Sequence, residues 1–364
     1  MKRILTFLFL TISISLSIRA VEIEVDRIHY ELDDTTMEAT LSYAPKDISG
    51  DIILPSQVES EGNIYPVVSI KEDAFYNCGA LTSIIIPEFV TSIGKYAFGN
   101  CLHLTKVTIP DCVATLGNYA FFNCISLSEI KLPELITEID DYTFYNCESL
   151  TEIIIPNNVK TIRNDAFADC KNLENVTISN SVFSIGMYAF SSCYSLKSIV
   201  IPDSVVSLGM SAFESCDLRT ITLGNSLITI EERCFDSNEG LEEVYSYSIM
   251  PPPCHGEGNR SPFNNILLSY VTLHVPYGSN GWYMNADYWD GFGTIIDDLP
   301  REGLGSSNGS TGLEEISKDY PENIKVYNLS GQLIITTTNK ADLNSLPKGI
   351  YIIDEGKVRT KLAI

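Results

Sequence analysis

The chain has 364 residues and a formal net charge of −23 at pH 7, with 47 acidic against 24 basic side chains. A surface of this sign repels phosphate backbones and anionic lipid headgroups, so nucleic acid and membrane surfaces are excluded as expected partners. A hydrophobic content of 45% is ordinary for a folded protein and excludes a wholly disordered chain.

Residues 1–20 have the composition of a secretory signal peptide. Lys2 and Arg3 form a basic start, an apolar stretch runs from Ile4 to Ile18, and Ala20 offers a small residue at a cleavage site. The apolar stretch is short for a membrane span, and a membrane anchor or a buried strand is the alternative interpretation. The pattern predicts export, and hence a place at the cell surface or outside the cell.

A 23-residue repeat dominates the middle of the chain. Cysteines recur at this spacing at Cys78, Cys101, Cys124, Cys147, Cys170, Cys193 and Cys216. A phenylalanine stands three residues before each of them, at Phe75, Phe98, Phe121, Phe144, Phe167, Phe190 and Phe213. A leucine follows three residues after each of the first six cysteines, whereas Leu218 comes one residue early in the seventh unit. A degraded eighth unit contains Phe235, Leu241 and Val244.

The first unit, AFYNCGALTSIIIPEFVTSIGKY, shows how the repeat should fold. Leu81, Ile84 and Ile86 indicate a strand, which Pro87 ends because proline has no N–H to donate. One unit cannot bury its own apolar residues, whereas stacked units share a core and pair their strands. We therefore predict a solenoid of about eight units over residues 74–248.

The segments on either side of the repeats are expected to cap the open ends of the solenoid. Residues 21–73 lead into a half repeat, and residues 249–300 contain both tryptophans, Trp282 and Trp289, which we expect to seal the last repeat. Residues 301–311 are rich in Gly and Ser and read as a linker. Residues 312–364 show alternating apolar runs around two Gly-containing turns, which predicts a small all-β domain.

The repeat pattern AFxNCxxLxxIxIPxxVxxIGxxAF resembles the BspA-type leucine-rich repeat of bacterial surface proteins, from about Ile52 to Val244. The resemblance implies a strand-rich leucine-rich-repeat solenoid with short helical turns. Thr143 departs from the pattern at an Ala position, and Ser179 and Gly224 depart from it at Pro positions. Similar proteins act as adhesins that attach cells to host matrix proteins, to other bacteria or to host cells.

The C-terminal domain resembles the type A sorting domain of proteins exported by type IX secretion. The resemblance rests on Val326, Tyr327, Gly331, Gln332, Leu346, Pro347, Gly349, Tyr351, Lys357, Arg359 and Lys361. It implies that residues 312–364 address the protein to outer-membrane secretion machinery. A plain accessory β-domain is the alternative.

No arrangement of residues predicts catalysis or a cofactor. The four histidines, His29, His103, His255 and His274, have no recognisable catalytic setting, and no Gly-rich phosphate loop is present. The pairs Cys101-x-His103 and Cys254-His255 lack a second pair at metal-ligand spacing. The seven periodic cysteines are expected to be buried free thiols, because equivalent side chains in stacked units run parallel and are poorly placed for a disulfide. Cys112 and Cys254 have no predicted role.

Candidate partner-binding residues are those that face outward on the predicted strands. They form two lines, one containing Ser83, Lys106, Glu129, Glu152, Asn175, Ser198, Thr220 and Glu243, the other Ile85, Thr108, Lys131, Ile154, Thr177, Val200, Thr222 and Tyr245. From these lines we select Lys106, Thr108, Glu129, Lys131, Glu152, Ile154, Asn175, Thr177, Ser198 and Tyr245. A row of Tyr96, Tyr119, Tyr142 and Tyr188 is a second candidate surface, or a cover over the convex side of the core.

Together these features predict a non-enzymatic surface protein that binds an extracellular protein or a glycan. The resemblance implies that the protein is an adhesin that recognises other proteins, whereas the repeats alone indicate only a binding scaffold. The alternative is a glycan- or nutrient-capture component, or an accessory module of a surface complex.

Overall fold

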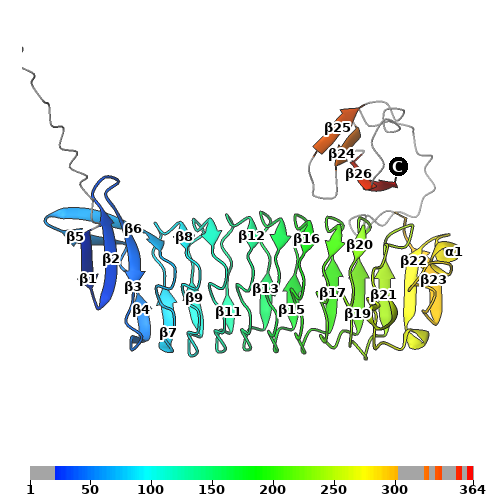
Figure 1. Ribbon diagram of the computed structural model, residues 1–364, viewed down its shortest axis with the longest axis horizontal. Coiled ribbons are helices and arrows are strands. Elements are labelled where there is room, and N and C mark those ends of the chain that lie inside the picture. The colour runs from blue at the N-terminus through cyan, green and yellow to red at the C-terminus, as the bar shows by residue number, and fades with distance from the viewer. Residues whose placement is uncertain (1–20, 302–323, 328–332, 338–349, 355–358, 364) are drawn as a thin grey trace, which may run out of the picture.

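A computed structural model describes residues 21–301 and the strand residues 324–327, 333–337, 350–354 and 359–363. The repeats form a row of strands stacked along one long axis, as Figure 1 shows. The predicted solenoid is therefore confirmed. The predicted signal peptide and all of the predicted linker beyond Arg301 lie outside the described residues.

One side of the solenoid, here called the sheet face, consists of parallel strands contributed once per turn of chain. These strands are β4 (Ser49–Ile53), β7 (Ala80–Ile85), β9 (Lys106–Thr108), β11 (Glu129–Ile130), β13 (Glu152–Ile154), β15 (Asn175–Thr177), β17 (Ser198–Ile201), β19 (Thr220–Leu223), β21 (Glu243–Ser246), β22 (Thr272–Pro276) and β23 (Thr294–Leu299). Side chains alternate across each strand, so that in β13 Ile153 is buried between exposed Glu152 and Ile154.

A second side carries shorter parallel strands. These are β6 (Asn63–Ile70), β8 (Ser92–Ile93), β10 (Thr115–Leu116), β12 (Glu138–Ile139), β14 (Thr161–Ile162), β16 (Ser184–Ile185), β18 (Ser207–Leu208) and β20 (Thr229–Ile230). The third side of each turn consists of hydrogen-bonded turns, such as Phe75 N–H to Ala97 O at 2.7 Å. The stack continues beyond the sequence repeat, because β22 and β23 add two further strands to the sheet face.

A column of stacked phenylalanine rings runs along the centre of the core. The rings of Phe75, Phe98, Phe121, Phe144, Phe167, Phe190, Phe213, Phe235 and Phe263 lie 5.1–5.7 Å from their neighbours and are nearly parallel. Each ring is buried, and each ring between Phe75 and Phe263 contacts the equivalent rings of the units before and after it. The column therefore couples every unit to its neighbours through apolar contact.

The periodic cysteines fill the core beside this column. All ten cysteines of the chain are free, which confirms the prediction of buried thiols for the seven periodic ones. The structure adds a polar role, since Cys101 Sγ lies 3.2 Å from the carbonyl oxygen of Phe75 in the preceding unit and the contact recurs down the stack. Burial raises the thiol pKa of Cys124 and Cys170 to about 12, so both are protonated at neutral pH.

A ladder of asparagine side chains supports the turn side. Asn100 Nδ2 donates to Asn77 Oδ1 at 2.9 Å, Asn123 to Asn100 at 2.8 Å, and Asn146 to Asn123 at 2.6 Å. These residues adopt positive φ angles between 57° and 66°, a conformation that asparagine tolerates better than most residues. The ladder therefore stabilises the repeated turn from one unit to the next.

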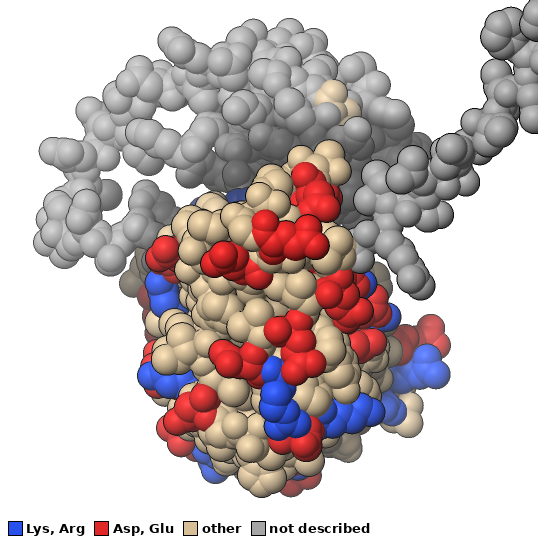
Figure 2. All heavy atoms as spheres, turned by 90° about the vertical axis from the view of Figure 1, so that its left-hand side faces the viewer, with Lys and Arg blue, Asp and Glu red and all other residues tan. Residues whose placement is uncertain are grey.

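An acidic antiparallel sheet covers the N-terminal end of the solenoid. It contains β1 (Val21–Val25), β2 (Ile28–Asp33) and β3 (Glu38–Tyr43), while β5 (Gln57–Ser60) pairs with β6 in a hairpin. Residues 21–73 contain 13 acidic side chains against Arg27, Lys46 and Lys71, and Figure 2 shows acidic groups spread over this end. Charge on an edge strand such as β1 opposes pairing with another chain, so this end is protected from stacking.

The C-terminal end is closed by the segment of chain on either side of β22. Before β22 this closing segment contains η1 (Gly258–Arg260) and η2 (Leu268–Tyr270), and after β22 it contains α1 (Asn280–Tyr283), the one α-helix among the described residues. Trp289 is buried, donates to Pro252 O at 3.0 Å and packs its ring against Phe263, as predicted for a residue that seals the stack. The same prediction is wrong for Trp282, which is 58% exposed because its helix turns it away from the core.

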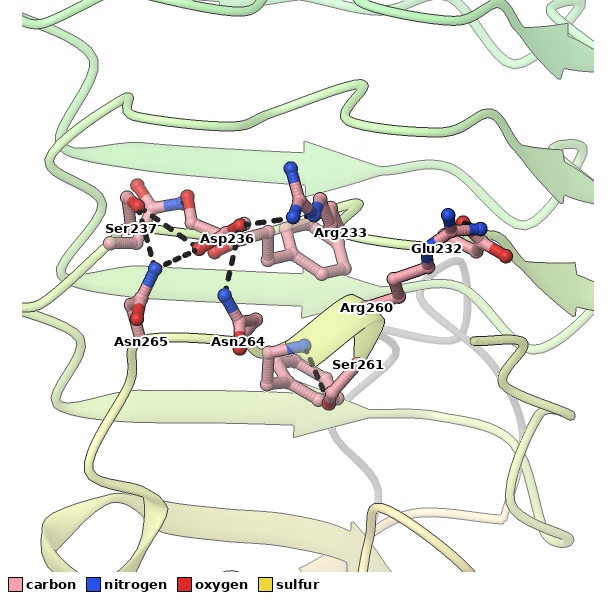
Figure 3. Close-up of polar contacts among 11 residues, drawn as sticks. Glu232, Arg233, Asp236, Ser237, Arg260, Ser261, Asn264 and Asn265 are labelled. Carbon is pink, nitrogen blue, oxygen red and sulfur yellow. Dashed lines mark hydrogen bonds and ion pairs between the residues drawn. The ribbon is translucent and has the colours of Figure 1, made fainter. Parts of the chain in front are cut away.

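A polar cluster joins the eighth unit to this closing segment (Figure 3). The carboxylate of Asp236, which is 3% exposed, accepts from Asn264 Nδ2 at 3.1 Å and from Asn265 Nδ2 at 3.0 Å. Ser237 Oγ donates to the same carboxylate at 3.0 Å, and Arg233 Nε lies 3.8 Å away. These partners compensate the cost of burying the carboxylate and tie the closing segment to the repeats.

Four strands are described near the C-terminus. They are β24 (Ile324–Tyr327), β25 (Leu333–Thr337), β26 (Ile350–Asp354) and β27 (Arg359–Ala363), and they form an antiparallel sheet in the order β25-β24-β26-β27. The predicted Gly331 and Gly356 turns lie outside the described residues.

Candidate partner-binding face

The two predicted lines of outward residues lie on the sheet face in register. Lys106 pairs with Glu129, Glu152 with Asn175, and Ile154 with Thr177, so residues 23 apart stand side by side. Nine of the ten selected residues are exposed, whereas Tyr245 is half-buried. Tyr245 is held by a hydrogen bond to Glu243 and by stacking on His274 at 4.4 Å. The solvent-facing side chains of this face are therefore available to a partner.

Ion pairs neutralise both lysines of this face. Lys106 Nζ lies 3.8 Å from Glu129 Oε2, and Lys131 Nζ lies 2.8 Å from Asp111 Oδ1. The hydrogen bond to Asp111 raises the pKa of Lys131, so this lysine stays charged at neutral pH. Glu152 has no ion pair among the described residues, so its carboxylate is available to a partner.

The parallel ladder of the sheet face is interrupted twice, between β11 and β13 and between β15 and β17. Within residues 21–301, β11 pairs only with β9 and β13 pairs only with β15, so β11 and β13 are not hydrogen-bonded to each other. A groove of about 570 Å³ lies at the first interruption, lined by Ser128, Glu129, Ile130, Lys131, Leu132, Glu134, Thr151, Glu152, Ile154 and Pro156. Four of the ten selected residues therefore border one depression.

The sequence prediction missed the groove and six of its lining residues, which are Ser128, Ile130, Leu132, Glu134, Thr151 and Pro156. One feature of the sequence coincides with the groove, namely the loss of a repeated glycine. A Cβ on Gly117 would lie 2.6 Å from the backbone nitrogen of Lys95, so glycine permits the close spacing of units there. Asp140 replaces this glycine in the third unit, where β10 and β12 are also unpaired. Arg163 replaces it in the fourth unit without breaking the ladder, so the substitution alone does not enforce an interruption.

The row of Tyr96, Tyr119 and Tyr142 has the character of a cover over the convex side of the core rather than of a surface for binding a sugar. The rings of Tyr96 and Tyr119 stack at 4.4 Å, and those of Tyr119 and Tyr142 at 4.7 Å, so these faces contact one another. All three tyrosines are half-buried. Stacked rings have no free faces between them for a sugar, which favours the convex-cover interpretation.

The described contacts of the histidines are with carboxylates and a backbone carbonyl, and His29 lies 3.4 Å from Glu22 and 3.7 Å from Glu24. His274 Nδ1 lies 2.9 Å from Asp298 Oδ2, but its Nε2 is buried with no hydrogen-bond partner among the described residues. A base in this position therefore has no nucleophile to activate. His103 Nδ1 contacts the carbonyl of Gly79 at 2.5 Å. In the described part of the chain, no group of three or more His, Cys, Asp or Glu side chains is arranged to hold a metal ion.

The family follows from the repeat sequence. The profile of BspA type leucine rich repeat regions matches residues 68–193 and 160–272, which together span more than half of the chain. The chain belongs to the BspA-type leucine-rich-repeat family. No functionally curated protein matches its sequence.

Several solved structures resemble this chain at low TM-scores. A leucine-rich repeat protein from Bacteroides ovatus is 28% identical, with 70% of this chain and 78% of that chain covered and a TM-score of 0.40. A leucine-rich cell surface protein from Faecalibacterium prausnitzii is 22% identical, with 80% and 99% covered and a TM-score of 0.46. The pneumococcal vaccine antigen PcpA is 15% identical, with 77% and 99% covered and a TM-score of 0.39.

No helix in residues 21–301, or in the four C-terminal strand segments, has the length and apolar character needed to cross a membrane.

Proposed function

We propose that this BspA-type protein is a secreted or cell-surface adhesin that binds other proteins through its sheet face, without catalysis or a cofactor. The observation that carries the proposal is the sheet face itself, whose strands point alternate side chains outward along the whole stack. Extended solenoid faces of this kind serve recognition. The mutual stacking of the half-buried tyrosines gives the glycan-capture alternative less support.

Delivery to the surface is part of the same proposal. Residues 1–20 act as a signal peptide, residues 21–73 and 249–300 cap the repeats of 74–248, and 301–311 link them to a sorting domain in 312–364. That domain engages the outer-membrane type IX secretion machinery. The antiparallel pairing of β24 to β27 is consistent with a compact β-domain.

Three substitutions on the sheet face test the binding surface. Lys131→Ala, Glu152→Ala and Thr177→Ala together remove outward side chains from neighbouring strands while leaving the core unchanged. We expect the full-length variant to lose about tenfold or more in affinity for its partner, because contacts at the centre of an interface dominate binding. Biolayer interferometry against immobilised matrix glycoproteins, with glycans in parallel, measures the change.

The matched control replaces Glu72, Thr137 and Lys160 by alanine, which are exposed residues of the same types away from the sheet face. This variant should bind like the wild type, and both variants should melt at the same temperature. Binding unchanged by the sheet-face substitutions would refute the proposed surface. Binding to glycans alone would refute the adhesin proposal and support glycan capture instead.

Delivery is tested by the intact mass of the exported protein. In a bacterium with type IX secretion, we expect a mature N-terminus near Val21 and surface delivery that is abolished when residues 312–364 are deleted. Delivery of the shortened chain at wild-type level would remove the sorting role. An uncleaved N-terminus would remove the signal-peptide assignment.

A further inference from the structure

The groove between β11 and β13 has an excess of negative charge. Glu129, Glu134 and Glu152 line it, against the single lysine Lys131. Lys131 is already paired with Asp111, and Glu129 is 78% exposed with only a 3.8 Å contact to Lys106. Neither Glu134 nor Glu152 has an ion pair among the described residues. The groove therefore favours a cationic group.

The two strands beside the groove are not open to a further strand between them. β11 and β13 each have a strand partner on only one side. Their units are nevertheless bonded to each other on both sides of the groove, because Ser149 N–H donates to Ile125 O at 3.1 Å and Asn158 Nδ2 donates to Glu134 O at 2.8 Å. A peptide would therefore lie over the groove, with its side chains rather than its backbone entering it.

The lining adds apolar contact and lacks the groups that other ligands need. Ile154 is 59% exposed beside Pro156 and Leu132, which suits the aliphatic stem of a lysine or arginine. No aromatic side chain lines the groove, so a sugar ring has no stacking partner there. A volume of about 570 Å³ accommodates several side chains.

We propose that this groove binds an extended segment of a protein partner that carries lysine or arginine side chains. The inference rests on the proposed function, because it names the chemistry of the partner at the sheet face. Carboxylates hold the cationic heads, and the Ile154 side chain contacts the stems.

The test uses the full-length chain and an eight-residue peptide of alternating Lys and Thr, with its ends blocked. Glu129→Gln, Glu134→Gln and Glu152→Gln remove the three charges at nearly constant shape. We expect saturable binding to the wild type and about tenfold or more weaker binding to the triple variant, because charge-assisted hydrogen bonds are lost. Isothermal titration calorimetry measures both affinities.

The matched control carries Glu59→Gln, Glu61→Gln and Glu72→Gln, which change the net charge equally at exposed positions in the N-terminal cap. Its affinity should stay within about twofold of the wild type, because charges beyond a Debye length are screened. An equal loss of peptide affinity in both variants would overturn the proposal, since the net charge of the protein rather than the groove would then attract the peptide. Competition by spermine at equal charge would also overturn it, because spermine carries the charge of the peptide without its spaced lysine side chains.

A second variant keeps the charges and fills the groove. Ile154→Trp should abolish peptide binding, whereas Ile53→Trp at an equally outward position of β4 should not. Wild-type affinity in Ile154→Trp would place the peptide elsewhere. If the peptide binds but no matrix protein does, the groove proposal is supported and the adhesin proposal is refuted. If matrix proteins bind the groove variants as strongly as the wild type, the adhesin proposal is supported and the groove proposal is refuted.

Discussion

Replacing Asn238 by cysteine, the residue that the repeat pattern calls for, is expected to destabilise the protein strongly. Asn238 is fully buried in the eighth unit at the position of the periodic cysteines. Its Nδ2 donates to Phe213 O at 2.9 Å, which is the carbonyl that a cysteine thiol would contact. Its Oδ1 accepts from the backbone N–H groups of Leu218 at 2.9 Å and Cys216 at 3.2 Å.

The Leu218 N–H needs a side-chain acceptor because the seventh unit is one residue short after Cys216. In a complete unit the Leu N–H bonds to its own cysteine carbonyl, as Leu104 does to Cys101 at 3.1 Å. The shortened unit lacks this bond, and a thiol cannot accept from both donors. Asn238→Cys should therefore lower the free energy of unfolding by about 2–5 kcal/mol, the cost of two buried donors without partners.

Urea denaturation followed by circular dichroism measures this loss. Cys170→Ala is the control, because it removes one weak thiol contact in a complete unit and should cost only about 1 kcal/mol. Inserting one residue after Asp217 in the Asn238→Cys background should restore most of the stability, since it rebuilds a complete unit. Wild-type stability of Asn238→Cys alone would contradict the compensating role of Asn238.

Replacing Phe144 by alanine is expected to have an effect of similar size. The Phe144 ring is fully buried and stacks on Phe121 at 5.4 Å and on Phe167 at 5.2 Å. Its removal leaves a cavity that two neighbouring units cannot fill, because their own rings are fixed in the column. We expect a loss of about 3–5 kcal/mol in the free energy of unfolding.

Phe89→Ala is the matched control for this substitution. Phe89 is 49% exposed, so its removal should change the stability by less than about 1 kcal/mol. Guanidinium denaturation of both variants gives the comparison. Equal losses at Phe144 and Phe89 would contradict the central position of the phenylalanine column.

Most of the fold could be predicted from the sequence because equivalent residues of successive units have the same neighbours. Phe98 and Cys101 recur every 23 residues, and positions that recur in this way must face the same neighbours in every unit. The same reasoning placed Glu152 and Asn175 side by side on the sheet face, as their pairing confirms. The alternation of side chains within each strand and the 23-residue period were sufficient to place these residues.

Other features depended on contacts between units, which no single repeat specifies. The closing strands β22 and β23 join the sheet face although their sequences no longer follow the period. The opposite exposure of Trp282 and Trp289 depends on how α1 meets the last turn. Asn238 reads as a lost cysteine until its bonds to the shortened unit are seen.

By itself, the sequence determined the solenoid, its register and the outward side chains, because these follow from a local period. Only the tertiary structure decided that the ladder of the sheet face opens beside the groove, between β11 and β13. That opening depends on how closely the backbones of consecutive units approach, which is a property of several contacts acting together. The candidate residues Glu129 and Glu152 become one site only through this spacing.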